Sequence, residues 1–211
     1  MVTLPDLKAF LTAGVHFGHS SGRWHPKAAW YIHSERGGVH IINVEKTVEQ
    51  LAEILPKITE HIAAGKVILF VGTKRQAAEI VKRHAMECGM PYITERWLGG
   101  LLTNFDSIKT MLDKYRQMSA DKAAGVWEKY TKIERVVFEI DLAKKDRFLS
   151  GLKEVKRMPE MVFLVDVRHE KTALTEAQSR KVPVVAIADT NINPEGITLP
   201  IPGNDDAVKS I

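Results

Sequence analysis

The chain has 211 residues, of which 45% are hydrophobic and 27% are charged, which is typical of a soluble globular protein and excludes an intrinsically disordered one. No apolar run approaches the roughly 18 residues of a membrane helix. The N-terminus has no secretory signal, and Cys88, the single cysteine, excludes an internal disulfide. We therefore expect a cytoplasmic protein with one large domain, or one domain with an insertion.

The net charge of +4 is unevenly distributed along the chain. Residues 104–158 contain 13 Lys and Arg and 9 Asp and Glu, so this segment carries the whole excess and the rest of the chain is formally neutral. A local excess of positive charge is expected of a surface that binds a polyanion. A solvated helical face can have the same composition, so charge alone does not decide between the two.

The first predicted elements are a helix, a strand and a second helix. A short helix is expected at 4–12, with Thr3 as its N-cap. After a stretch rich in Gly, His and aromatic residues, an apolar β-branched run predicts a strand at 39–43. Apolar residues at helical spacing then predict a helix at 44–64.

Uninterrupted apolar runs are typical of strands that are buried on both faces. Three such runs occur, at 67–71, 161–165 and 184–188. A helix and a further strand are predicted after the first run, at 75–88 and 91–94, and a helix at 170–180 separates the last two runs. This alternation predicts an α/β fold with a parallel sheet and right-handed crossovers.

Residues 104–158 interrupt the alternation of strands and helices. Apolar side chains recur every three or four positions in two stretches, which a turn containing Gly125 separates. Two amphipathic helices in series with no strand between them predict an antiparallel hairpin. The sequence thus predicts a globular α/β domain formed by 1–103 and 159–211, with a basic helical hairpin inserted at 104–158.

Two segments after predicted strands are candidate phosphate contacts. Lys74 and Arg75 follow the first buried run, where a strand-to-helix turn favours an anion. The Gly-rich fingerprint of a nucleotide site is missing, so an RNA phosphate is favoured over a free nucleotide, and a solvated helix start is the alternative. Arg96 and Trp97 precede paired glycines, so Arg96 could contact phosphate. Trp97 could stack on a base or pack in the core.

A basic and aromatic loop is the third candidate. Arg23, Trp24 and Lys27 lie in a stretch that also contains Gly and Pro, and such loops suit contacts to phosphate, sugar and unstacked bases. The alternative is a loop that Trp24 anchors.

A divalent metal site is a separate candidate. Asp189 ends a predicted strand, Asp205 and Asp206 lie in a late loop, and all three could converge on a histidine of the N-terminal stretch, although histidines more often satisfy hydrogen bonds. No Cys pair, HExxH motif or catalytic triad is present. A nucleotide-binding enzyme and a metal-dependent hydrolase using His16 and His19 are therefore less well supported than a binding protein.

An ordered set of motifs resembles the bacterial S2 family of small-ribosomal-subunit proteins. The motifs cover essentially the whole chain and are AGVHFGH at 13–19, WHPK at 24–27, VHIIN at 39–43, ILFVGTKR at 68–75, RWLGG at 96–100, DTN at 189–191 and IPGNDD at 201–206. The resemblance implies a flavodoxin-like sheet with flanking helices and a protruding helical hairpin. Members usually continue past this last motif into another helix, of which 205–211 would be the beginning.

The resemblance also implies a function. It implies a structural protein, not an enzyme, that binds 16S-type rRNA, bridges the head and body of the small subunit and helps to dock neighbouring ribosomal proteins, among them protein S1. No membrane and no small-molecule substrate are implied. A divalent ion, zinc or magnesium, would bind at His19, Asp189, Asp205 and Asp206. The hairpin candidates for rRNA contact are Asn104, Lys109, Lys114, Arg116, Lys132, Arg135, Lys144 and Lys145.

Overall fold

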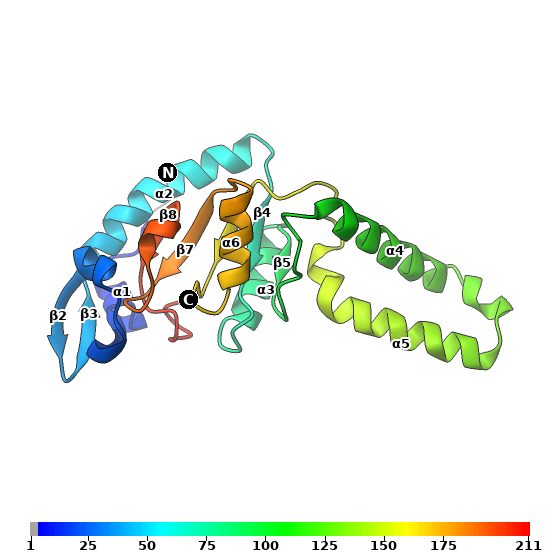
Figure 1. Ribbon diagram of the computed structural model, residues 1–211, viewed down its shortest axis with the longest axis horizontal. Coiled ribbons are helices and arrows are strands. Elements are labelled where there is room, and N and C mark those ends of the chain that lie inside the picture. Colours follow the sequence, from blue (N-terminus) through cyan, green and yellow to red (C-terminus); the bar gives the residue numbers. More distant parts are fainter. Residues whose placement is uncertain (1–3) are drawn as a thin grey trace.

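The structure is a computed structural model, and it describes residues 4–211. Figure 1 shows three parts in a row: a small sheet at one end, a central sheet covered by helices, and a helical hairpin that projects from the other end. None of the helices within residues 4–211 is long and apolar enough to cross a membrane.

The central sheet confirms the predicted parallel α/β fold. Its strands are β4 (Ile68–Val71), β5 (Tyr92–Ile93), β6 (Met161–Leu164), β7 (Val184–Ala188) and β8 (Leu199–Pro202). They lie in the order β5-β4-β6-β7-β8, and every neighbouring pair is parallel. Counted along the chain this is the order 2-1-3-4-5 of flavodoxin-like folds, with a switch point between β4 and β6.

Helices cover both faces of this sheet because its strands are apolar on both faces. The helices are α2 (Val44–Ala63), α3 (Ala78–Glu87) and α6 (Lys171–Ser179). On one face Ile54 of α2 packs against β4, β6 and β7. Val81 of α3 packs in a neighbouring cluster with Val165 and Ile187. On the other face α6 packs together with the base of the hairpin.

The small sheet contains the strand that is predicted at 39–43. The segment forms β3 (Val39–Ile42), but β3 is not a strand of the parallel sheet. It lies between β1 (Phe17–Ser20) and β2 (Ile32–Arg36) and is antiparallel to both. Neither of these two strands is predicted from the sequence.

Two helices begin later than predicted. The first helix is α1 (Leu7–Ala13), and its N-cap is Asp6, whose carboxylate accepts a hydrogen bond from the Ala9 amide. The predicted cap Thr3 lies outside the described residues. Helix α3 begins at Ala78, because the chain after β4 first forms a turn instead of the helix predicted from residue 75.

The hairpin has the predicted antiparallel form. It consists of α4 (Phe105–Ala123) and α5 (Lys132–Leu149), joined by a turn in which Gly125 is left-handed. At its base, Ile108 and Leu112 of α4 and Leu149 of α5 are buried in the main core cluster. Near its tip, Phe138 packs against Trp127 and Tyr130. The hairpin is therefore rooted in the globular domain and has a small core of its own farther out.

Candidate functional site: a polar cluster at the sheet edge and a basic hairpin

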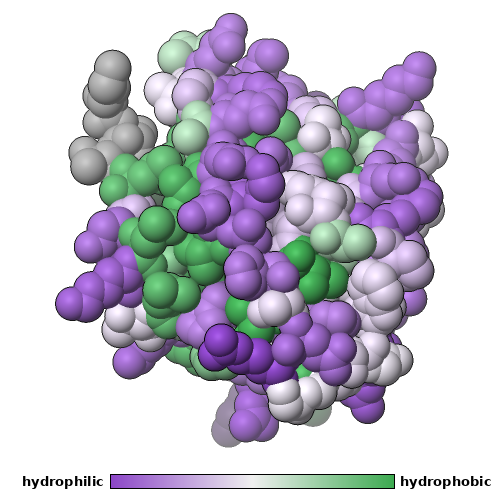
Figure 2. Space-filling view, turned by 90° about the vertical axis from the view of Figure 1, so that its left-hand side faces the viewer, coloured by the Kyte–Doolittle hydropathy of each residue, from purple (hydrophilic) through white to green (hydrophobic). Residues whose placement is uncertain are grey.

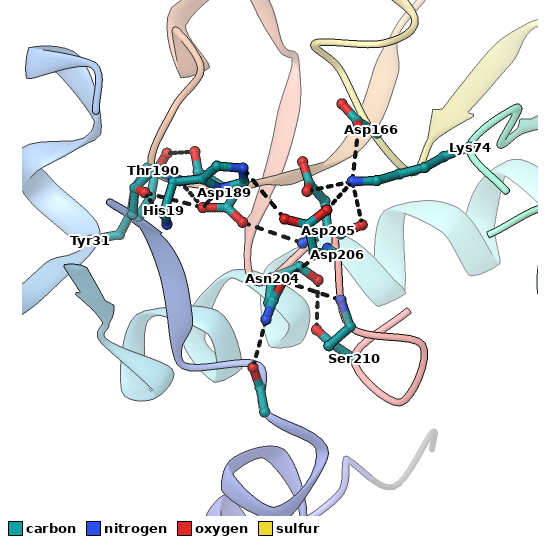
Figure 3. A network of polar contacts seen from close by, with 12 residues as sticks. His19, Tyr31, Lys74, Asp166, Asp189, Thr190, Asn204, Asp205, Asp206 and Ser210 are labelled. Atoms are coloured by element: carbon teal, nitrogen blue, oxygen red, sulfur yellow. Dashed lines mark hydrogen bonds and ion pairs between the residues drawn. The ribbon is translucent and has the colours of Figure 1, made fainter. Parts of the chain in front are cut away.

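The carboxyl ends of the parallel strands and strand β1 bring five charged side chains and a histidine together. Lys74 follows β4, Asp166 follows β6, Asp189 follows β7, and Asp205 and Asp206 follow β8. His19 comes from β1 of the small sheet and points into the same group, as Figure 3 shows. Strands that are parallel end at one edge, which is why residues far apart in the sequence meet here.

A close backbone contact allows β1 to reach this edge. The His19 amide donates a hydrogen bond to Thr190 Oγ1 at 2.9 Å, just after β7. A Cβ atom at Gly18 would lie 2.7 Å from the Thr190 methyl group, so a larger residue would push β1 away. Residue 18 must therefore be glycine for β1 to lie this close to the segment after β7.

Lys74 fills the switch point of the sheet. Its Nζ lies 3.1 Å from an oxygen of Asp166, 3.0 Å from one of Asp205 and 2.6 Å from one of Asp206. Burial opposes the charged amine, but hydrogen bonds to Asp206 and Asp205 outweigh this and raise the pKa of Lys74. The crevice where related α/β folds bind ligands therefore holds the protein's own ammonium group.

Asp189 holds His19 in place. His19 Nδ1 lies 3.0 Å from Asp189 Oδ1, and His19 Nε2 lies 3.4 Å from Asp206 Oδ2. The hydrogen bond with Asp189 raises the pKa of His19, although burial opposes it. Asp189 itself is buried, and its backbone carbonyl accepts a hydrogen bond from the Tyr31 hydroxyl at 2.8 Å.

The two neighbouring aspartates of the late loop differ in acidity. Burial, together with the nearby charges of Asp166 and Asp189, raises the pKa of Asp205 to about 7. The hydrogen bond from Lys74 lowers the pKa of Asp206, which is more exposed. The cluster thus combines one readily ionised carboxylate with one that holds its proton more strongly.

The residues present fit a divalent ion. One ligand atom each from His19, Asp205 and Asp206 lies within 4.8 Å of the others. An imidazole nitrogen with carboxylate oxygens is a donor set that zinc accepts. Asp189 is expected from the sequence to be a ligand of the ion. In the structure its carboxylate contacts Nδ1 of the His19 ring, whereas Nε2 of that ring faces Asp206. Asp189 is placed to orient the histidine ligand.

Most of the predicted RNA contacts lie on the surface. The exposed ones are Arg23, Trp24, Lys27, Arg75, Arg96, Asn104, Lys109, Lys114, Lys132, Arg135 and Lys144. Lys27 forms an ion pair with Glu195, and Asn104 precedes the first turn of α4. The set spreads from the small sheet to the hairpin and forms no single site.

Four predicted contacts are buried or half-buried, and their side chains have partners inside the protein. Lys74 is held by carboxylates, as described above. Arg116 donates to the backbone carbonyls of Lys153 and Val155, both at 2.6 Å, and so ties the hairpin to the segment that follows it. Lys145 is half-buried and pairs with Asp141.

Trp97 is the fourth, and it packs in the core. Its side chain is 7% exposed, so it cannot stack on a base. Its Nε1 donates a hydrogen bond of 2.9 Å to Glu176, a buried acid that is not among the residues predicted from the sequence. The signal that could have identified Glu176 is an acidic residue on the apolar face of α6, beside Ala173 and Ala177.

Comparisons with known proteins identify the family. A family model described as "Ribosomal protein S2" matches residues 10–211. Over 205 residues, 97% of this chain, the small ribosomal subunit protein uS2 of Treponema pallidum is 43% identical, and that of Bdellovibrio bacteriovorus is 44% identical. The matches span 70% and 66% of those two proteins. With the parallel sheet and the inserted hairpin, these matches show that the chain belongs to the ribosomal protein S2 family, whose members are structural and not enzymatic.

Proposed function

We propose that the chain is a structural constituent of the small ribosomal subunit that binds 16S-type rRNA, bridges the head and body of the subunit and helps to dock neighbouring ribosomal proteins. Membership of the ribosomal protein S2 family carries this proposal. The ribosome is the expected location. The filled switch point supports a role without catalysis, since Lys74 occupies the place that a nucleotide would need.

The hairpin is proposed as the main electrostatic contact with rRNA. Five of its exposed cations form no ion pair or hydrogen bond through their side chains within residues 4–211, namely Lys109, Lys114, Lys132, Arg135 and Lys144. Free cations on a projecting arm can neutralise phosphates and release counterions. The globular domain is proposed to add individual contacts with rRNA, through Arg23, Trp24, Arg75 and Arg96.

The end opposite the hairpin is proposed to dock a neighbouring protein. Leu7 and Leu11 of α1 are 46% and 50% exposed, and Phe17 of β1 is 50% exposed. Figure 2 views this end and shows the apolar patch beside polar surface. A protein segment with apolar side chains would bury this patch, and protein S1 is the partner that we propose.

A divalent ion, zinc or magnesium, is proposed at His19, Asp205 and Asp206, with Asp189 orienting the histidine. The ion would supply a structural cross-link between β1 and the loop after β8. Zinc suits the imidazole nitrogen better, whereas magnesium prefers oxygen ligands and retains water.

The hairpin proposal is tested by removing its five free cations. We expect that changing Lys109, Lys114, Lys132, Arg135 and Lys144 to Gln weakens binding to a 16S-type rRNA transcript. The salt dependence of log K should flatten by roughly 0.7–0.9 for each lost phosphate contact. Filter binding at several salt concentrations measures both.

A matched control removes five cations from the globular domain, with Gln at Lys46, Lys57, Lys66, Lys82 and Lys209. Both variants carry the same net charge. If the control loses as much affinity as the hairpin variant, general charge and not the hairpin is responsible for binding.

A further inference from the structure

We infer that a recess in the globular domain binds one unpaired nucleotide of the RNA, with its phosphate on three cations and its base between polar amides and an apolar wall. The inference rests on the proposed function and names a contact that the hairpin does not supply. The recess has a volume of about 750 Å³, which is within the usual range for sites that enclose a small ligand.

The recess is formed at the carboxyl ends of β6 and β7, beside the polar cluster but sharing no residue with it. Arg168 follows β6, Lys171 lies in the first turn of α6, and Asn191 and Asn193 follow β7. Arg23 closes the recess from the loop after β1. This loop is fixed to the sheet, because the His25 amide donates a hydrogen bond of 2.8 Å to the Thr190 carbonyl.

The charge of the recess is positive and unbalanced. Arg23, Arg168 and Lys171 are exposed, and none of their side chains forms an ion pair or hydrogen bond with any residue in 4–211. Among residues 4–211, no acidic side chain lines the recess. The chain outside the hairpin is formally neutral, so these three cations are a local concentration and favour an anion.

The polar groups of the recess favour a nucleobase in addition to a phosphate. The Asn191 side-chain oxygen is buried and has no hydrogen-bond partner among the described residues. Buried polar atoms are rarely left unpaired, so this oxygen is a candidate acceptor for a ligand. Asn193 uses its own side-chain oxygen to accept from the Glu195 amide at 3.1 Å, which leaves its amino group as a donor.

An apolar wall completes the site. Leu174 of α6 and Ile192 line the recess, and Ile192 is buried against the main core. A flat base can lie against this wall while its edge meets the asparagine amides, which is how proteins read single-stranded RNA. A duplex could not do this because its bases are stacked and paired. No glycine of the described chain lines the recess, so the close backbone cradle of a free-nucleotide site is not formed there.

Two variants of the full chain test the recess. The first variant changes both Arg168 and Lys171 to Gln and removes two positive charges. The second, Asn191→Leu, removes hydrogen-bonding groups without changing the charge. Arg180 and Lys209 changed to Gln are the matched control for charge, and Gln76→Leu is the control for polarity. All three control side chains are exposed and lie outside the recess. Thermal unfolding establishes that each variant folds.

Binding to a 16S-type rRNA transcript and dimethyl sulfate footprinting are the readouts. We expect the wild-type chain to protect the edge of at least one unpaired base, and both recess variants to lose that protection. Affinity should fall about tenfold when Arg168 and Lys171 are changed to Gln, because two contacts to phosphate are lost. It should fall about fivefold for Asn191→Leu, because one hydrogen bond is lost. Only the charge pair should flatten the salt dependence.

Three results would overturn the inference. The first is that the recess variants keep the wild-type affinity and footprint while the hairpin variant binds weakly. This would show that the recess does not bind RNA, but it would not contradict the proposed function. A wild-type chain that does not bind rRNA would remove both. Tight binding of uridine monophosphate or of a poly-glutamate peptide that needs Arg168 and Lys171 would show a free-nucleotide or protein site instead.

Discussion

Glu176 shows how one buried side chain fixes a whole loop. Its carboxylate accepts hydrogen bonds from Trp97 Nε1 at 2.9 Å and from the backbone amides of Gly100, Leu102 and Thr103 at 2.8, 3.1 and 3.2 Å. Burial would raise the pKa of Glu176, but these donors outweigh it and lower the pKa below its ordinary value. The loop before the hairpin is thereby held by one acid from α6.

We expect Glu176→Gln to destabilise the fold at pH 7 by about 1–3 kcal/mol, because an amide offers fewer acceptor sites to the same donors. A folded pKa below the unfolded value gives stability that is present above the unfolded pKa, roughly 4.3, and is lost as the pH falls through the folded pKa. Urea unfolding should therefore show a lower free energy of unfolding for the variant than for the wild type at pH 7, and this difference should become smaller at pH 3. An equal difference at both pH values would contradict this account, and Glu60→Gln on the exposed side of α2 is the control.

At the scale of elements, the hairpin combines a rooted base with an open arm. Its base contributes Ile108, Leu112 and Leu149 to the main core, and the hydroxyl of Tyr115 bonds the carboxylate of Asp146 across the two helices. Beyond that bond the side chains of α5 are mostly exposed. The boundaries 104–158 predicted from charge therefore include residues on which the globular core depends.

Two deletions separate these parts. Replacing 119–143 by a short Gly-Ser linker should leave a cooperatively folded core with nearly unchanged thermal stability, but with greatly weakened rRNA binding. Deleting all of 104–158 should destabilise the core strongly, since each buried leucine that is lost costs about 2–5 kcal/mol. Circular dichroism melts and filter binding distinguish the two. If the variant that lacks 119–143 has an unfolded core, or binds rRNA normally, the outer arm and the base of the hairpin do not have these separate roles.

The elements that the sequence predicts well are those whose pattern is local. The buried strands β4, β6 and β7 are continuous apolar runs, and the hairpin has helical periodicity. Strand β8 contains Pro200 and Pro202, which usually argue against a strand, and it is tolerated because it lies at the sheet edge. Strands β1 and β2 are short, polar and half-exposed, so their pairing depends on β3 and not on their own composition.

The same distinction holds for the candidate site. His19, Asp189, Asp205 and Asp206 are grouped from motif order and strand ends, and the structure brings them together. Lys74 could not be assigned its partners, because no local pattern shows which late residues return to the end of β4. For the same reason Arg168 and Lys171 show no signal in the sequence: their recess exists only after the loop at 21–25 folds over α6.

At the scale of the whole molecule, the polar cluster joins distant parts of the chain. Asn204 donates its side-chain amide to the Gly14 carbonyl at 3.1 Å and its backbone amide to the Val15 carbonyl at 3.1 Å. His19 contacts Asp206 in the same region. The small sheet is thus attached to the loop after β8, and a bound ion would tighten this attachment.

The pH dependence of stability should change sign when zinc is bound. Without metal, the raised pKa of His19 gives stability that is present below its unfolded pKa of about 6.5 and is lost as the pH rises through the folded value. With zinc, protons compete for His19 and Asp205, so the stabilisation should appear at pH 7.5 and vanish at pH 5.5. At 100 times the dissociation constant it should reach about 2.7 kcal/mol.

Thermal unfolding with EDTA, zinc and magnesium at both pH values measures this. His19→Gln should abolish the rise in melting temperature caused by zinc, whereas His33→Gln, which changes an exposed histidine, should keep it. An equal rise in the two variants would show that zinc acts elsewhere.

The contacts of Lys74 also set an order of events during synthesis of the chain. Its partner Asp166 directly follows β6, but its partner Asp205 lies 131 residues after Lys74, so both strands that flank the switch point are made before the full set of acids around this amine. The hairpin emerges in between and can form early from local contacts. While the protein is being made, the hairpin can therefore exist before the edge of the parallel sheet closes, because this edge needs the loop after β8.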